Sequence, residues 1–174
     1  VEYELTYEFF HGGVDVTMRY KTGKFLDYLP RVGLRFALDK NVQKFAYEGY
    51  GPYESYVDKH MASAYGRYES TAKKAYGKYI KPQETGSHFA STELCLENGV
   101  KVVAEKPFSF SVLPYSTEEI RGANHDFELG RSKETYVCLD IAMSGVGTAS
   151  CGPALKEEYR APREGENKFR ILVK

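Results

Sequence analysis

The stretch Tyr47–Tyr56 reads Tyr-Glu-Gly-Tyr-Gly-Pro-Tyr-Glu-Ser-Tyr. Glycine and proline at Gly49, Gly51 and Pro52 argue against a helix, because both residues have the lowest helix propensities. The stretch follows residues with the alternating apolar pattern of a β-strand. We therefore predict a strand that runs into a rigid turn, with the carboxyl group of Glu54 among tyrosine rings.

The same alternation marks the first residues of the chain as a hairpin. Apolar side chains take every second position in two runs, which are Tyr3, Leu5, Tyr7 and Phe9, and then Val14, Val16, Met18 and Tyr20. The sequence His11-Gly12-Gly13 separates the runs, and glycine suits the positive φ angles of a tight turn. We predict two paired strands with one buried and one wet face.

Further strands are predicted at residues 32–38, 44–47, 88–96, 100–105, 108–113, 134–141 and 168–174. Asn98-Gly99 predicts a second hairpin turn, and Ser116 followed by acidic residues predicts the start of a short helix. Residues 49–80 are irregular in pattern, and so long a loop usually serves a function or a partner. The pattern predicts an all-β fold, one antiparallel β-sandwich domain over residues 1–174, with about nine or ten strands in two sheets packed face to face.

The composition argues against several classes of partner. Lysine plus arginine total 24, as do aspartate plus glutamate, so charge gives no reason to expect nucleic acid or an anionic membrane. No apolar run approaches the roughly 20 residues of a membrane span. The three widely spaced cysteines, Cys95, Cys138 and Cys151, favour free thiols and the reducing cytoplasm. Because Val1 is not a start methionine, we expect a longer parent protein, whose own N-terminus could carry an export signal.

Aromatic residues are unusually frequent, with 15 tyrosines and 10 phenylalanines. Aromatic rings favour strands, and exposed tyrosines also suit stacking on sugar rings, so the composition permits carbohydrate binding. Glycosidases use two carboxyl groups, and Glu54 with Glu84 is one candidate pair. The alternative is that these acids, with Asp58 in the same loop as Glu54, anchor loops by accepting backbone N–H bonds or face a neighbouring domain. The rigid Gly-Pro and Pro-Gln turns favour loop anchoring.

Other chemistries find less support in the sequence. The glycine-rich segment Gly145–Pro153 lacks the GxxxxGKS/T pattern of a phosphate-binding loop and the helix that would follow it. The four histidines share no metal-ligand spacing with one another or with the cysteines, so we expect no metal or other cofactor in this chain. Lysines and tyrosines interleave over residues 73–81, a pattern that suits single-stranded nucleic acid, but a solvated loop face is favoured.

Four stretches, in this order and spacing, resemble the C-terminal domain of bacterial β-galactosidases of glycoside hydrolase family 2. They are Leu29–Leu34, Gly51–Tyr56, Tyr79–Gly86 and Gly145–Pro153. The sequence departs from the family where Thr85 replaces the usual Asn and where Lys59 replaces the common Arg. It also has Cys151 where many members have Trp, so the broad ring of that tryptophan is missing.

The resemblance implies a fold for this chain and a catalytic site in another domain. The family's domain is part of a galactose-mutarotase-like supersandwich that is longer than this chain. The uncovered strands are therefore expected either to close a smaller sandwich or to self-associate into a homo-oligomer. The family's catalytic glutamates lie in a separate barrel domain, so no catalytic residue is expected in this chain.

The resemblance also implies an activity and a set of site residues. The intact enzyme would hydrolyse terminal β-galactosides such as lactose, with retention of configuration. This chain would pack against the catalytic barrel domain of the same polypeptide, with Cys151, Ser150 and Gly152 approaching the galactoside. Glu54, Tyr56 and Glu84 would hold loops at that interdomain face. Two alternatives stay open, a stand-alone carbohydrate-binding module and a structural sandwich without ligand contact.

Overall fold

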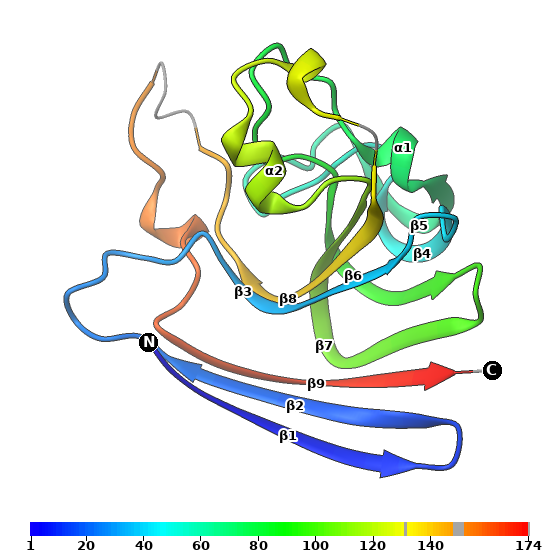
Figure 1. Cartoon of the computed structure of the whole chain (residues 1–174). Coiled ribbons are helices and arrows are strands. Elements are labelled where there is room, and N and C mark those ends of the chain that lie inside the picture. Colours follow the sequence, from blue (N-terminus) through cyan, green and yellow to red (C-terminus); the bar gives the residue numbers. More distant parts are fainter. Residues whose placement is uncertain (131, 148–151, 174) are drawn as a thin grey trace.

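Antiparallel strands dominate the computed structural model, which describes residues 1–130, 132–147 and 152–173 (Figure 1). The strands in these ranges are β1 (Glu2–Phe10), β2 (Gly13–Lys21), β3 (Arg31–Asp39), β4 (Lys44–Gly51), β5 (Ala64–Thr71), β6 (Ser87–Leu96), β7 (Val100–Leu113), β8 (Glu134–Met143) and β9 (Glu164–Val173). The helical segments are α1 (Ala72–Ala75), α2 (Thr117–Gly122), η1 (Asp126–Glu128) and η2 (Glu157–Tyr159). The prediction of an all-β antiparallel fold is confirmed.

The longest strand, β7, has three neighbours. Along one edge it pairs with β6, and along the other it pairs first with β9, over Val100–Ala104, and then with β8, over Ser109–Leu113. The sheet therefore branches at β7 into β9-β2-β1 and β8-β3, while β6 continues to β4 and β5. We predicted two sheets, but hydrogen bonds join the described strands into one sheet of nine, because β7 is 14 residues long and reaches both branches.

The change of partner along β7 occurs at Lys106 and Pro107. Proline has no N–H to offer a neighbouring strand, and Pro107 lies between the two paired stretches. The side chain of Asn167, which is 3% exposed, accepts a hydrogen bond from the Lys106 N–H at 3.1 Å and donates one to the Lys106 carbonyl at 3.0 Å. A side chain of β9 thus completes the backbone bonds where we predicted a break between two strands.

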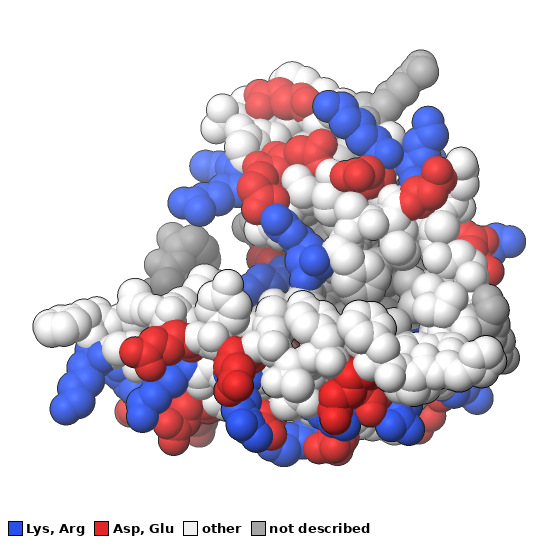
Figure 2. Space-filling view, turned by 60° about the horizontal axis from the view of Figure 1, so that its bottom comes forward, with Lys and Arg blue, Asp and Glu red and all other residues white. Residues whose placement is uncertain are grey.

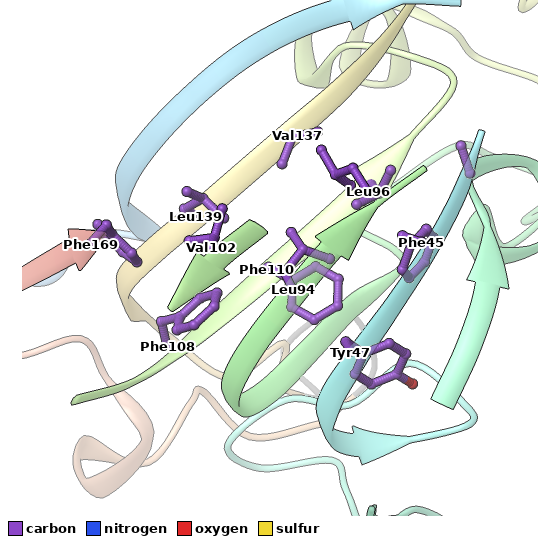
Figure 3. Close-up of a cluster of buried hydrophobic side chains, with 12 residues drawn as sticks. Phe45, Tyr47, Leu94, Leu96, Val102, Phe108, Phe110, Val137, Leu139 and Phe169 are labelled. Carbon is purple, nitrogen blue, oxygen red and sulfur yellow. The ribbon is translucent and has the colours of Figure 1, made fainter. Parts of the chain in front are cut away.

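The main core gathers side chains from β4, β6, β7, β8 and β9 (Figure 3). The ring of Phe110 is fully buried, with its centroid 5.1 Å from those of Tyr47 and His88 and 5.9 Å from that of Phe45. Ring pairs at such separations contribute about 1 kcal/mol each beyond the burial of their area. The surrounding aliphatic and aromatic residues are Leu94, Leu96, Val102, Phe108, Val112, Val137, Leu139 and Phe169.

Two local predictions from the sequence are confirmed. The first strands pair as a hairpin with Tyr3 opposite Tyr20, and Gly12 adopts a φ of 85° in the turn, but the predicted buried face is present on β2 and not on β1. The helix α2 begins with a capping box, in which the Ser116 side chain accepts from the Glu119 N–H at 3.1 Å and the Glu119 carboxylate accepts from the Ser116 N–H at 2.8 Å.

Strand β5 and helix α1 lie within residues 49–80, where no regular element was predicted. Few side chains of β5 are buried, so its sequence carries no strong alternation. The strand forms because its backbone pairs with β4 along its whole length, from Ala64 opposite Gly51 to Thr71 opposite Lys44. Among the described residues, no helix is long and apolar enough to cross a membrane.

Replacing Phe110 by alanine should lower the free energy of unfolding by about 3–5 kcal/mol, because the change removes a buried ring and leaves a cavity. The matched control is Phe127→Ala, since Phe127 is 82% exposed, and its effect should stay within about 0.5 kcal/mol. Urea unfolding of the purified chain, followed by circular dichroism, measures both. Equal losses in the two variants would contradict this description of the core.

Candidate functional site

The carboxylate of Glu54 joins three separate parts of the chain. It accepts hydrogen bonds from the Tyr79 hydroxyl at 2.6 Å, the Thr85 hydroxyl at 2.9 Å and the Gly86 N–H at 2.9 Å. The ammonium group of Lys59 lies 2.7 Å from the same carboxylate. The turn after β4 is therefore fastened to the loop that precedes β6.

These donors set the ionisation of Glu54. Burial by itself would raise the pKa of Glu54, but the bonds from Lys59, Tyr79, Gly86 and Thr85 outweigh burial and lower that pKa. The carboxylate is thus held in its charged form. A carboxylate with four donors around it suits an anchor better than a nucleophile or a proton donor, which favours loop anchoring over the catalytic alternative for Glu54.

Tyr56 lies beneath these loops and is 2% exposed. Its hydroxyl is buried without a hydrogen-bond partner among the described residues. Burial raises the pKa of Tyr56, and the nearby charges of Glu84 and Glu54 raise it further. The phenol therefore stays neutral, and its buried ring supports the segment that carries Glu54.

Glu84 belongs to a second charged group, centred on Arg31. The Arg31 guanidinium binds both oxygens of Asp140, at 3.1 and 2.5 Å, and lies 3.3 Å from Oε2 of Glu84. The other carboxylate oxygen of Glu84, Oε1, is buried and has no hydrogen-bond partner among the described residues. Burial raises the pKa of Glu84, against the lowering effect of Arg31. This side chain thus keeps an unused acceptor.

Asp58 fixes the start of the glycine-rich segment. Its carboxylate accepts hydrogen bonds from the N–H groups of Val146, at 3.1 Å, and Gly147, at 2.8 Å. A Cβ on Gly145 would lie 2.3 Å from the carboxyl carbon of Asp58, and Gly147 has a φ of 63°, so glycine is favoured at both positions. We name this contact the Asp58 clamp.

A cavity of about 620 Å³ opens beside the Asp58 clamp. Its walls combine two tyrosine rings, three charged side chains and the backbone of the glycine-rich segment. They are formed by Tyr28, Pro30, Arg31, Lys59, Tyr79, Gln83, Glu84, Met143, Ser144 and residues 145–147. Phenol rings next to charged donors and acceptors suit a polyhydroxylated ligand or a polar loop of a partner domain.

The structure brings some of the predicted site residues together. Glu54 and Tyr56 lie in one cluster, and Glu84 lies next to it on the cavity wall. Ser150 and Cys151 are outside the described residues, and Gly152 is exposed. Sequence reasoning missed the role of Arg31, because it acts through contacts with residues far along the chain, and it named Asp58 as a possible loop anchor without its partners.

The described residues contain no group of three or more histidine, cysteine or acidic side chains that could hold a metal ion. His88 lies instead in the core, where burial lowers its pKa to about 4. Cys95 and Cys138 are free thiols.

Glu54→Gln should lower the free energy of unfolding by about 2 kcal/mol at neutral pH, because charge-assisted hydrogen bonds are lost. The folded-state pKa of Glu54 is lowered, so its contribution is present above the unfolded pKa of about 4.3 and is lost as pH falls through the folded pKa. The difference between wild type and variant should therefore shrink under acid conditions.

Urea unfolding of both proteins between pH 7 and pH 3 measures this difference. Glu158→Gln is the control, since the Glu158 side chain is 62% exposed and, within the described part of the chain, its ion pair is with Lys156 at 3.6 Å. A difference that grows as the pH falls would show that the pKa of Glu54 is raised, and would contradict the anchoring role.

Comparison with known proteins shows which family this chain resembles. The family model described as Beta galactosidase small chain matches residues 1–173. A β-galactosidase of Actinobacillus pleuropneumoniae is 48% identical over 146 residues, which are 84% of this chain and 14% of that protein. One from Streptococcus thermophilus is 38% identical over 153 residues, 84% of this chain and 15% of that protein.

A β-galactosidase small subunit of Latilactobacillus sakei is 33% identical over an alignment of 178 positions, which covers 93% of this chain and 55% of that subunit. The chain thus spans about a seventh of the two long relatives and about half of the small subunit. The match to the family model covers nearly every residue of the chain. The chain belongs to the β-galactosidase small-chain family.

Proposed function

We propose that this chain is an accessory part of a β-galactosidase, which packs on the catalytic barrel domain and helps to shape the sugar site. The intact enzyme would hydrolyse terminal β-galactosides such as lactose with retention, using carboxyl groups carried outside this chain. The observation that carries the proposal is the Asp58 clamp. It fixes the start of the segment in which Ser150, Cys151 and Gly152 would contact the galactoside.

The anchoring contacts support this role. An accessory surface helps catalysis only if it holds its shape when the substrate arrives, since ordering a loop during binding costs free energy. Glu54 ties the turn after β4 to the loop before β6, while Tyr56 lies beneath them. Glu84 lines the cavity and pairs with Arg31 at 3.3 Å, which helps to hold that wall in place.

A stand-alone carbohydrate-binding module is the second candidate. The rings of Tyr28 and Tyr79, which line the same cavity with Lys59, favour it. An NMR titration of the isolated chain with lactose and galactose separates the two. Saturable shifts at the cavity would support the module, whereas no shifts at tens of millimolar sugar would mean that sugar contact requires the barrel domain.

We also propose a cellular compartment and an assembly state for the intact enzyme. The free thiols of Cys95 and Cys138 fit the reducing cytoplasm. The barrel domain would be the main partner, and the intact enzyme would assemble as a homo-oligomer.

In the intact enzyme, Cys151→Ala should raise the KM for lactose several-fold with a smaller change in kcat, because the thiol would supply apolar contact to the bound sugar and no chemistry. Cys95→Ala is the matched control, since Cys95 lies on β6, away from the glycine-rich segment. Steady-state kinetics of both variants measure the effect. Unchanged kinetics for Cys151→Ala would remove Cys151 from the sugar site.

Asp58→Asn in the intact enzyme should raise the KM without an equal loss of thermal stability. An amide keeps one acceptor oxygen, so it can hold only one of the two N–H groups that the carboxylate now holds. Asp39→Asn is the control, because Asp39 accepts a single backbone N–H, from Asn41, at a distant turn. If both variants have the wild-type KM, the Asp58 clamp does not position a sugar-site loop.

A further inference from the structure

A second cavity, which we name the α2 cavity, adjoins the one beside the Asp58 clamp. Its volume is about 380 Å³, and small-molecule sites typically enclose about 300–1,000 Å³. The two cavities share Arg31, Gln83 and Glu84, but most of their other walls differ. Those of the α2 cavity come mainly from α2, the last residues of β7 and the first half of β8. The α2 cavity is therefore a separate place for a ligand.

The guanidinium group of Arg121 is free to bind such a ligand. Within the described part of the chain, Arg121 makes no hydrogen bond or ion pair, although it lines the α2 cavity. A guanidinium group has five N–H donors in a planar arrangement that matches the oxygens of a phosphate or carboxylate. The other described arginines all donate to a carboxylate or a backbone carbonyl, and they are Arg19, Arg31, Arg35, Arg67, Arg160, Arg163 and Arg170.

A second free cation, the ammonium group of Lys81, lines the same cavity. Lys81 is exposed and has no ion pair within the described ranges. Of the other charges here, Arg31 is neutralised by Asp140 at 2.5 Å, and Glu84 offsets one cation. Figure 2 shows basic and acidic side chains mixed over the visible face of the molecule. Against that balance, the α2 cavity keeps a net positive charge and attracts an anion.

The remaining walls of the α2 cavity offer groups that suit a sugar. The rings of Tyr115 and Tyr136 are half-buried and line the cavity, and a tyrosine ring presents an apolar face on which the C–H groups of a pyranose can pack. Ser111 supplies a hydroxyl group and Gln83 an amide, and both can donate to or accept from sugar hydroxyl groups. Anion-binding and sugar-binding groups thus line one cavity.

We propose that the α2 cavity binds a phosphorylated monosaccharide. Arg121 and Lys81 would hold the phosphate group, because arginine and lysine are the side chains that bind phosphate most strongly. The ring of Tyr136 would contact the sugar, and Ser111 and Gln83 would bind its hydroxyl groups. The proposal concerns a second ligand site and stands whether or not Cys151 contacts the galactoside.

An acidic segment of another domain fits the α2 cavity less well. An aspartate or glutamate side chain could reach Arg121 and Lys81, which are exposed, but it would leave the groups deeper in the cavity unused. Ser111, for example, is only 1% exposed. A small molecule that carries both an anionic group and hydroxyl groups uses the mouth and the interior together.

Isothermal titration calorimetry of the full-length protein tests the proposal. Galactose 6-phosphate is titrated at low ionic strength, with inorganic phosphate and galactose as comparison probes. We expect galactose 6-phosphate to bind to the wild type. Arg121→Gln should weaken this binding by about tenfold or more, because charge-assisted hydrogen bonds to the phosphate are lost, and Lys81→Gln should weaken it several-fold.

Arg19→Gln is the matched control. Arg19 is exposed like Arg121, but it lies on β2 and does not line the α2 cavity. Its replacement removes the same charge, so an unchanged affinity would show that the effect of Arg121→Gln is local. Because both arginines are exposed, both variants should fold as the wild type does.

A further variant, Tyr136→Leu, tests the contact with the sugar. It should weaken the binding of galactose 6-phosphate several-fold and leave the binding of inorganic phosphate unchanged, because only the sugar would lie on the ring. Equal affinities of the wild type for the two probes would mean that the sugar makes no contact, and would reduce the α2 cavity to a simple anion site.

Two other results would overturn the proposal. If Arg121→Gln binds galactose 6-phosphate as tightly as the wild type, the ligand lies elsewhere in the protein. If the wild type gives neither heat nor a change in the phosphorus NMR signal of the ligand at millimolar concentration, the α2 cavity does not bind a sugar phosphate.

Discussion

The fold depends on the backbone pairing of one strand, β7, with three neighbouring strands. Strand β7 gives one edge to β6 and divides the other between β9 and β8. At the division, the buried side chain of Asn167 completes the backbone bonds of Lys106. Because an unpaired buried N–H or C=O would cost about as much as a lost hydrogen bond, this side chain allows one continuous sheet to enclose a core. The loops of the candidate site project from that sheet.

Two acids, Glu54 and Asp58, then organise the loops by the same means. Each accepts backbone or hydroxyl donors from segments that lie 25 to 89 positions away in the sequence. Neither acid needs to take part in chemistry to matter for function. If the proposed function holds, a sugar site between two domains would need walls of fixed shape on both sides, and these carboxylates would supply the rigidity on this side.

Strong apolar alternation made most strands of the fold predictable. The other elements and contacts were not predictable, because they depend on weak patterns or on residues far apart in the sequence. The hairpin β1-β2 follows from residues such as Val16 and Met18, which alternate with polar neighbours. Strand β8 follows from Val137, Leu139 and Ile141, which are apolar at every second position. Strand β5 could not be predicted, because its pairing with β4 and not its side chains determines it. The candidate site, too, was predictable only in part. The turn that carries Glu54 was recognisable, whereas the contact between Asp58 and Gly147 depends on how the chain returns to itself.

The network around Glu54 has a consequence for the motions of the protein. Its donors come from three stretches of chain, and each bond helps to fix the position of the others. Breaking one contact weakens the rest, so the turn after β4 and the loop before β6 should open together as one cooperative unit. In hydrogen exchange, the amide of Gly86 would then exchange at the rate of its distant neighbours along this network. Fluctuations at the candidate site would be rare, collective events, and the site would spend nearly all its time in a single shape.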